Sequence, residues 1–154
     1  MDKILKDISI VATSYDKMIG RSVVKIQFQG NLYYGDAWLC SEDKDVESSF
    51  VGHNIALARA KKALFEDYKN KVQKELKYYQ NLINHCRCYK DWEEESNCSK
   101  ILKKQIKLKE KEVNEVKKEI ETLKAEIKYL GSERLDKTRE IMRKKREKNR
   151  NKAK

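Results

Sequence analysis

The sequence predicts an α+β protein, with a small three-stranded antiparallel sheet followed by a long antiparallel helical hairpin and a short basic C-terminal helix. Apolar and polar residues alternate with a period of two through residues 8–40, as they do in strands. Through residues 51–130 apolar residues recur in steps of three, four or seven, which is the helical pattern. In addition, 40% of the residues are charged and none is proline, which suits long exposed helices. We therefore divide the chain into a strand-rich head with the start of the first helix (1–60), a hairpin (61–131) and a basic helix or tail (132–154).

The head contains three predicted strands joined by two turns. In the first two strands, the residues that alternate with polar or small neighbours are Ile8, Ile10, Ala12, Val24, Ile26 and Phe28. Residues 16–20 form the first turn, and Gly30-Asn31 forms the second, because both residue types accept the positive φ of a tight hairpin. The third strand runs from Tyr33 to Cys40. Its small residues Gly35 and Ala37 share one face, on which a helix could lie close.

The second long helix carries a heptad seam that only Lys109 interrupts. β-branched residues alternate with leucine along it, a pattern that favours a two-stranded coiled coil. The partner is either the first helix, which starts near Phe50, or another copy of the chain. We expect a homodimer or higher oligomer, held together by seam residues Ile106, Val113, Val116, Ile120, Leu123, Ile127 and Leu130. Gly131 should then end this helix, and Ser132 should cap the basic one.

Positive charge is concentrated at the C-terminus. The formal net charge is +11, and residues 132–154 hold eleven Lys or Arg against four Asp or Glu, a surplus of seven. Such a segment attracts any polyanion through its long-range field. The alternative is a solvated helix end that keeps the protein in solution.

The sequence offers few groups for catalysis. It has no glycine-rich phosphate loop, no nucleophile elbow and no carboxylate pair with a histidine, so we predict a binding protein that needs no cofactor and is not an enzyme. His85, Cys86, Cys88 and Cys98, in and around the cysteine-containing loop 84–99, form a weak candidate zinc site. Only one residue separates Cys86 from Cys88, however, whereas zinc knuckles use two to four. The alternative is spare thiols at a hairpin tip.

The chain shows neither a membrane span nor a secretory signal, since Met1-Asp2-Lys3 is not a basic segment followed by an apolar one. We expect a cytoplasmic protein with reduced thiols.

Aromatic residues on the third strand suggest a binding surface. Tyr33, Tyr34 and Trp38, with Arg59 nearby on the first helix, could offer ring stacking and a planar charge to a nucleotide. The alternative is that these rings only cover the sheet, because strands favour aromatic residues for packing.

A family resemblance favours the interpretation that this surface binds a nucleotide. Residues 34–43 place a glycine and an alanine on the strand and a cysteine before an acidic loop; residues 52–60 follow with a glycine and an Ala-x-x-Arg-Ala helix start. This cassette is similar to one that recurs in small proteins of phages and their Gram-positive hosts. With the strand-rich head and long helices, it resembles the first type of Thoeris anti-defence protein.

The resemblance implies a function. Proteins of that family are phage sponges that act in the infected bacterial cell, where they bind the cyclic ADP-ribose signal of bacterial immune enzymes without cleaving it. Their pocket uses arginines, an aromatic residue and a methionine from paired subunits. Arg59 and Met142-Arg143 match these positions. Trp38 is an aromatic residue of the required type, so the expected ligand is a nucleotide-derived anion, either a cyclic ADP-ribose isomer or a cyclic oligonucleotide.

Two other functions remain open at this point. Three strands, a helix and a basic extension could present charge to double-stranded RNA or DNA. Alternatively, the helical hairpin could act as a scaffold or as a direct inhibitor of a host protein.

Overall fold

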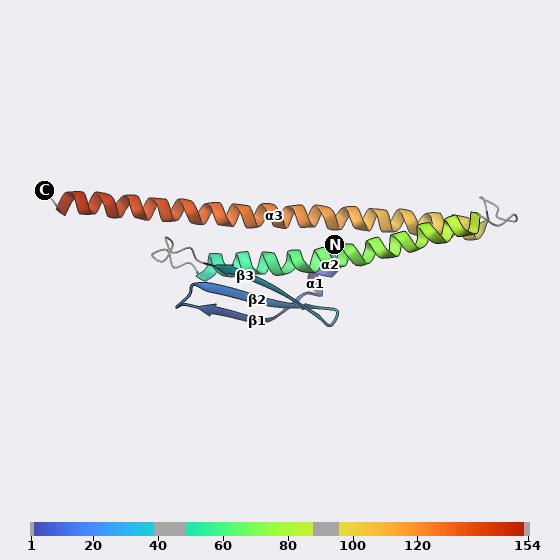
Figure 1. Cartoon of the computed structure of the whole chain (residues 1–154), viewed down its shortest axis with the longest axis horizontal. Coiled ribbons are helices and arrows are strands. Elements are labelled where there is room, and N and C mark those ends of the chain that lie inside the picture. The colour runs from blue at the N-terminus through green and yellow to red at the C-terminus, as the bar shows by residue number, and fades with distance from the viewer. Residues whose placement is uncertain (1, 39–48, 88–95, 153–154) are drawn as a thin grey trace. The chain divides into compact units, whose positions relative to one another are not determined.

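The computed structural model describes residues 2–38, 49–87 and 96–152, and Figure 1 labels the elements. They are α1 (Asp2–Lys6), β1 (Ser9–Asp16), β2 (Arg21–Phe28), β3 (Asn31–Trp38), α2 (Ser49–Arg87) and α3 (Asn97–Lys152). A three-stranded sheet followed by two long helices confirms the α+β prediction. The chain divides into two compact units, described separately below. The head unit comprises Asp2–Leu64 with Thr122–Lys154, and the hairpin unit comprises Phe65–Glu121.

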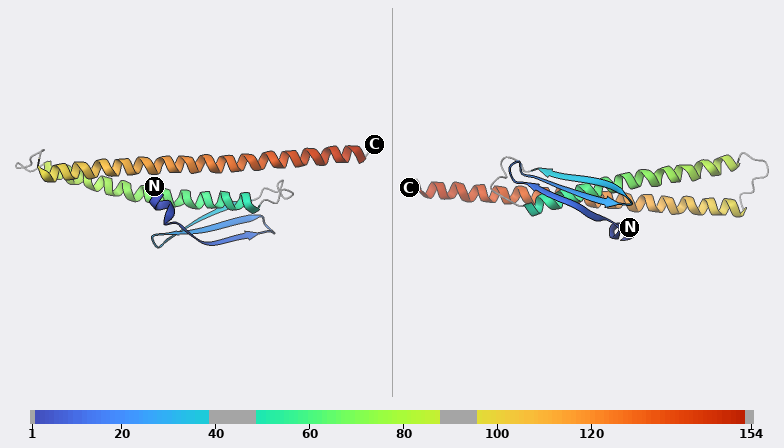
Figure 2. Two further views of the ribbon diagram at one scale, coloured as in Figure 1. Left: turned by 180° about the vertical axis from the view of Figure 1, so that it is seen from behind. Right: turned by 90° about the horizontal axis from the view of Figure 1, so that it is seen from below.

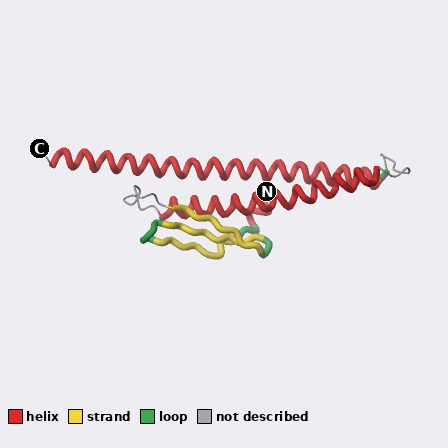
Figure 3. The backbone as a smooth tube through the Cα atoms, in the orientation of Figure 1, coloured by secondary structure: helices red, strands yellow, loops and turns green. Residues whose placement is uncertain are grey.

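The sheet is an antiparallel meander in the order β1-β2-β3, and Figure 3 shows its three strands joined by short turns. The first turn forms where the sequence predicts it, with the Asp16 carboxylate accepting hydrogen bonds from the amides of Met18 (2.9 Å) and Ile19 (3.3 Å). The second turn lies one residue earlier than predicted. Its central residues are Gln29 (φ 49°) and Gly30 (φ 80°), because Asn31 already belongs to β3. The positive φ values suit the twist of a two-residue hairpin.

One face of the sheet packs against the first part of α2, as the views of Figure 2 show. On this face Ser22, Val24, Ile26 and Phe28 of β2 are all buried. Gly35 of β3 lies directly beneath the helix, and a Cβ atom there would overlap the backbone of Ala56 and Ala60. Gly52 makes a similar approach, since a Cβ there would lie 2.6 Å from the Ser22 hydroxyl oxygen. The small residues of the cassette therefore allow helix and strand to pack backbone against backbone.

The hairpin unit pairs the second part of α2 with the first part of α3. Its buried apolar residues are Phe65, Val72, Ile83, Leu102, Val113, Val116 and Ile120. Much of the predicted heptad seam is thus already covered within one chain. Ile106 of this unit is half-buried. In the head unit Leu123 is buried as well, whereas Ile127 and Leu130 are half-buried. Self-association through these seam residues stays a prediction.

Lys109, the charged residue within the seam, lies among polar partners. Its Nζ atom is 2.8 Å from Glu75 Oε2 and 3.0 Å from Glu112 Oε2, while Glu112 also accepts a hydrogen bond from the Tyr68 hydroxyl. Burial and the bond to Glu112 raise the pKa of Tyr68 to about 12. The hydrogen bond to Glu75 raises the pKa of Lys109 above its usual range. For Glu112, burial alone would raise the pKa, but the bonds from Tyr68 and Lys109 outweigh it and the pKa is lowered. At neutral pH, Tyr68 therefore stays neutral, whereas Lys109 and Glu112 stay charged.

The helix does not end at Gly131 as the sequence suggested. α3 continues through this residue to Lys152, so residues 132–152 extend α3 and do not form a separate short helix. Gly131 does not adopt a positive φ, and Ser132 donates its hydroxyl hydrogen to the carbonyl oxygen of Tyr129 (2.8 Å), a bond that serines make inside helices. A helical glycine costs only about 1 kcal/mol relative to alanine, which neighbouring turns can offset.

Candidate functional site

The candidate site is a cluster at the Trp38 end of the sheet, formed by three side chains on the face opposite α2 and by one arginine from α2 itself. We call it the Arg–Trp cluster; its members are Arg21, Asp36, Trp38 and Arg59. Antiparallel pairing places Arg21 directly opposite Trp38, and the strand period of two places Asp36 and Trp38 on the same face. Arg59 comes from α2, between the buried residues Ala58 and Ala60. Its Nη1 atom donates a hydrogen bond to the carbonyl oxygen of Asp36 (2.5 Å).

Asp36 contacts the other three members of the cluster. Its Oδ2 atom accepts a hydrogen bond from Trp38 Nε1 (2.8 Å) and lies 3.4 Å from Nη2 of Arg21. The Arg21 guanidinium also lies over the Trp38 ring, with Cζ 4.7 Å from the ring centroid. One carboxylate therefore contacts both an indole and a guanidinium on the outer face of the sheet.

The cluster is suited to anions despite this carboxylate. Two guanidinium groups against one carboxylate leave one net positive charge. The side chains of Arg21 and Asp36 are 40% and 42% exposed, so their ion pair at 3.4 Å is worth little and is easily exchanged for another anion. In addition, Arg21 Nε is buried and has no hydrogen-bond partner among the described residues. A buried donor without an acceptor costs about 1–3 kcal/mol.

The outer face of the sheet carries a second pair of the same type. Lys25 Nζ lies 5.3 Å from the centroid of the Tyr34 ring, directly across from it on β2. Tyr34 and Trp38 are both about half exposed (58% and 52%). Tyr33 points to the other face and is half-buried, so it is not part of this surface. The face thus offers two exposed rings, each beside a cation.

The structure brings together two of the four predicted ligand-binding residues. Trp38 and Arg59 both bind Asp36, as described above. Arg143 is exposed on α3, and the side chain of Met142 lies outside the described part of the chain. The part that Met142 and Arg143 play in ligand binding stays a prediction.

The sequence analysis missed Arg21 and Asp36 as members of the site. A signal for both was present: once the turn between β2 and β3 is located, the register pairs Arg21 with Trp38. The contact between Arg59 and the backbone of Asp36 has no such signal, because it depends on how α2 lies across the sheet.

The candidate zinc ligands lie at the end of the hairpin. His85 and Cys86 belong to the last turns of α2, and Cys98, which is exposed, belongs to the first turn of α3. Cys88 lies outside the described residues. Within the described residues, no three His, Cys, Asp or Glu side chains are grouped so that they could hold a metal ion.

Comparisons with known proteins add no assignment. No protein-family model, curated protein or solved structure significantly matches this chain. In the part of the chain that the structure describes, no helix is both long and apolar enough to cross a membrane.

Proposed function

We propose that this protein binds a nucleotide-derived anion at the Arg–Trp cluster and retains it without turnover, as a phage anti-defence sponge does. The observation that carries the proposal is that the Arg21 guanidinium and the exposed Trp38 indole both contact the Asp36 carboxylate, while the Arg59 guanidinium binds the carbonyl oxygen of the same residue. These groups are suited to a ligand that carries phosphate and a base. The first candidate is a cyclic ADP-ribose isomer, the ligand of the family that the cassette resembles, and the second is a cyclic oligonucleotide.

Each group of the cluster has a part in this binding. The guanidinium groups of Arg21 and Arg59 present planar sets of N–H donors that match phosphate oxygens in pairs. The Trp38 ring offers its exposed face for base stacking, a contact worth about 1–3 kcal/mol per base. The Asp36 carboxylate can accept a hydrogen bond from a ribose hydroxyl or an exocyclic amine. A ligand that carries both a pyrophosphate and adenine would engage all four residues.

The resemblance supports sequestration in particular. It also implies that a second subunit completes the pocket, which is the part proposed for Met142 and Arg143. The protein would then act as a homodimer or higher oligomer in the cytoplasm of an infected bacterial cell.

The direct test is capture and release. The purified full chain is incubated with cyclic ADP-ribose isomers or cyclic oligonucleotides, freed of unbound ligand by desalting and heated to release what it holds. Mass spectrometry of the released material should recover intact ligand at a fixed ratio to protein. Recovery of cleaved products would mean an enzyme, and recovery of nothing from any ligand would overturn the proposal.

A matched pair of variants tests the location. Arg21→Gln removes one guanidinium from the cluster and should weaken binding by about 10- to 150-fold, since a hydrogen bond to a charged group is worth about 1.5–3 kcal/mol. Lys25→Gln is the control, because it also removes one positive charge and one cation–π contact from β2. It should change affinity by less than about threefold if it loses only long-range attraction. Equal losses in the two variants would show that general charge, and not this cluster, binds the ligand.

The two alternatives from the sequence predict different behaviour. Binding of nucleic acid through the basic C-terminal segment should collapse between about 50 and 200 mM salt when several phosphates are contacted, whereas a small ligand held by two arginines should respond weakly. A scaffold or inhibitor that acts through the hairpin should bind neither class of ligand.

A further inference from the structure

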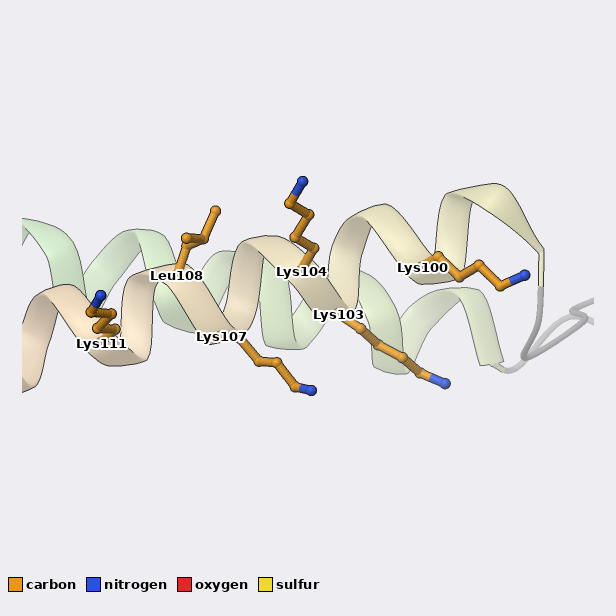
Figure 4. A pocket seen from close by; sticks show the side chains of 6 residues that line it. All are labelled: Lys100, Lys103, Lys104, Lys107, Leu108 and Lys111. Carbon is orange, nitrogen blue, oxygen red and sulfur yellow. The ribbon is translucent and has the colours of Figure 1, made fainter.

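A row of five lysines lies on the hairpin unit, remote in sequence from the Arg–Trp cluster. Lys100, Lys103, Lys104, Lys107 and Lys111 line an open hollow on α3 together with Leu108 (Figure 4). We call these five residues the lysine row. At about 100° per residue they fall within an arc of roughly 100°, and they extend over about 16 Å of helix. The arc is centred opposite the seam residues Leu102 and Val113, which are buried. Four of the five lysines are exposed and Lys103 is half-buried, so the row forms a ridge of ammonium groups on the side of α3 away from the seam.

The needs of folding do not explain this row. The first turn of α3 contains no acidic residue and begins the row with Lys100, although the positive end of the helix dipole disfavours a cation there by about 0.3–1 kcal/mol. Lysines three and four residues apart also repel one another, each pair costing about 0.2–0.5 kcal/mol. The ion pair of Lys111 with Glu115 is long, at 3.9 Å, and exposed. An arrangement that costs stability is expected where an anionic partner compensates.

We infer that the lysine row is a contact site for the phosphate backbone of a nucleic-acid duplex. A length of about 16 Å exceeds the roughly 12 Å width of a B-form major groove, so one ridge can reach phosphates on both sides of it. Ammonium groups on flexible stems suit phosphates in any sequence and carry no planar preference. An anionic membrane surface fits less well, because a helix lying in a membrane needs a broad apolar face, and among the described residues that line this hollow Leu108 alone is apolar. This inference is independent of the function proposed for the Arg–Trp cluster.

The test measures how binding depends on salt. Fluorescence anisotropy with a labelled 20-base-pair DNA duplex of mixed sequence, and with the matching RNA duplex, is recorded at several salt concentrations for the full chain. Each phosphate contact contributes about 0.9 to the slope of log K against log salt on B-form DNA. The triple variant Lys100→Gln/Lys104→Gln/Lys107→Gln should therefore lower the slope by about 2.7 and weaken binding by about 500-fold at 100 mM salt. This difference is expected whatever the basic C-terminal segment contributes.

Two further variants serve as controls. Lys117→Gln/Lys124→Gln/Lys128→Gln removes the same charge from exposed positions farther along α3, and it should leave the slope within about 0.5 of the unmodified chain. Replacing Lys100, Lys104 and Lys107 by arginine should preserve binding, because the charge is kept. Circular dichroism should show unchanged helix content in all three variants, since the substituted side chains lie away from the buried seam.

Several results would overturn the inference. They are no duplex binding at 50 mM salt, equal loss in the two glutamine variants, and an unchanged slope when the lysine row is neutralised. A fourth is sedimentation with vesicles containing anionic lipid that depends on the row while duplex binding does not, which would assign the row to a membrane surface.

Discussion

Replacing Gly35 by alanine should destabilise the head unit severely. The added methyl group would overlap the backbone of Ala56 and Ala60, and because the obstacle is backbone, no side-chain rotation can relieve it. The helix must then retreat from β3, which opens the contact between Gly35, Ala56 and Ala60 that the small residues make. Inserting a group into a packed core costs about 1–3 kcal/mol, and we expect at least the upper value here, about 3 kcal/mol. For a chain of this size that corresponds to a fall in Tm of roughly 10 °C.

Urea and thermal unfolding followed by circular dichroism measure this effect. Gly131→Ala is the matched control, because it adds the same methyl group at a helical glycine with no atom within 4 Å. It should stabilise the protein by up to about 1 kcal/mol through helix propensity. The packing argument fails if Gly35→Ala costs less than about 1 kcal/mol. Similarly, destabilisation by Gly131→Ala would indicate that the helix ends at this glycine, as the sequence alone suggested.

Three other outcomes follow from the same structure. Gly52→Ala should destabilise the protein by about 1–2 kcal/mol, because the new Cβ would lie 2.6 Å from the Ser22 hydroxyl oxygen. Adding Ser22→Ala to the same chain should restore most of that stability in urea unfolding. If it does not, the contact between the two residues is contradicted. Folding raises the pKa of Tyr68 to about 12, so the folded state binds the phenol proton more tightly than the unfolded state. The resulting contribution to stability is complete below pH 10 and is lost as the pH rises through 12. Tyr68→Phe should therefore remove one late-titrating tyrosine from an ultraviolet titration and make the fall of Tm at alkaline pH less steep. Lys109→Met restores an apolar seam but leaves the part-buried carboxylates of Glu75 and Glu112 without their cation. It should therefore destabilise the hairpin by about 1–3 kcal/mol at pH 7. A more stable variant would show that these ion pairs do not contribute to stability.

The strands and the seam were predictable because each depends on a local period. Alternation in β2 identifies Val24, Ile26 and Phe28 as core residues, and they are buried. The heptad pattern likewise identifies Val113 and Val116. These patterns do not predict which helix packs against a seam. The same spacing serves a hairpin within one chain and a pair of chains equally well, and only the fold shows that α2 already covers part of it.

The two local errors have a common physical origin. The sequence predicts glycine and asparagine as the positive-φ residues of the second turn, yet Gln29 adopts φ 49° because the strand register requires it. It also predicts a helix end at Gly131, yet α3 passes through this residue. In both places a propensity of about 1 kcal/mol or less is outweighed by the elements on either side. Residue type alone therefore located these boundaries only approximately.

In the cassette that resembles a known family, the small residues are explained by packing and the arginine is not. Gly35, Ala56 and Ala60 are needed because strand and helix meet backbone to backbone, and Gly52 is needed because of Ser22. Any protein with this close packing would require small residues there, whatever it binds. The packing therefore explains most of the cassette without reference to a ligand, and the small residues alone are weak evidence for sequestration.

Arg59 is the cassette residue that packing does not require. Its guanidinium reaches the Asp36 carbonyl oxygen at the edge of β3, and this contact uses one of its five N–H donors. Two roles are thus open to it: holding the edge strand and binding a phosphate. They are separable, because Arg59→Gln removes the charge from an exposed position and should cost about 1 kcal/mol of stability or less while reducing ligand affinity at least tenfold. A loss of stability without loss of affinity would make Arg59 an edge-strand residue, and the ligand would then be bound by Arg21 and Trp38 without it.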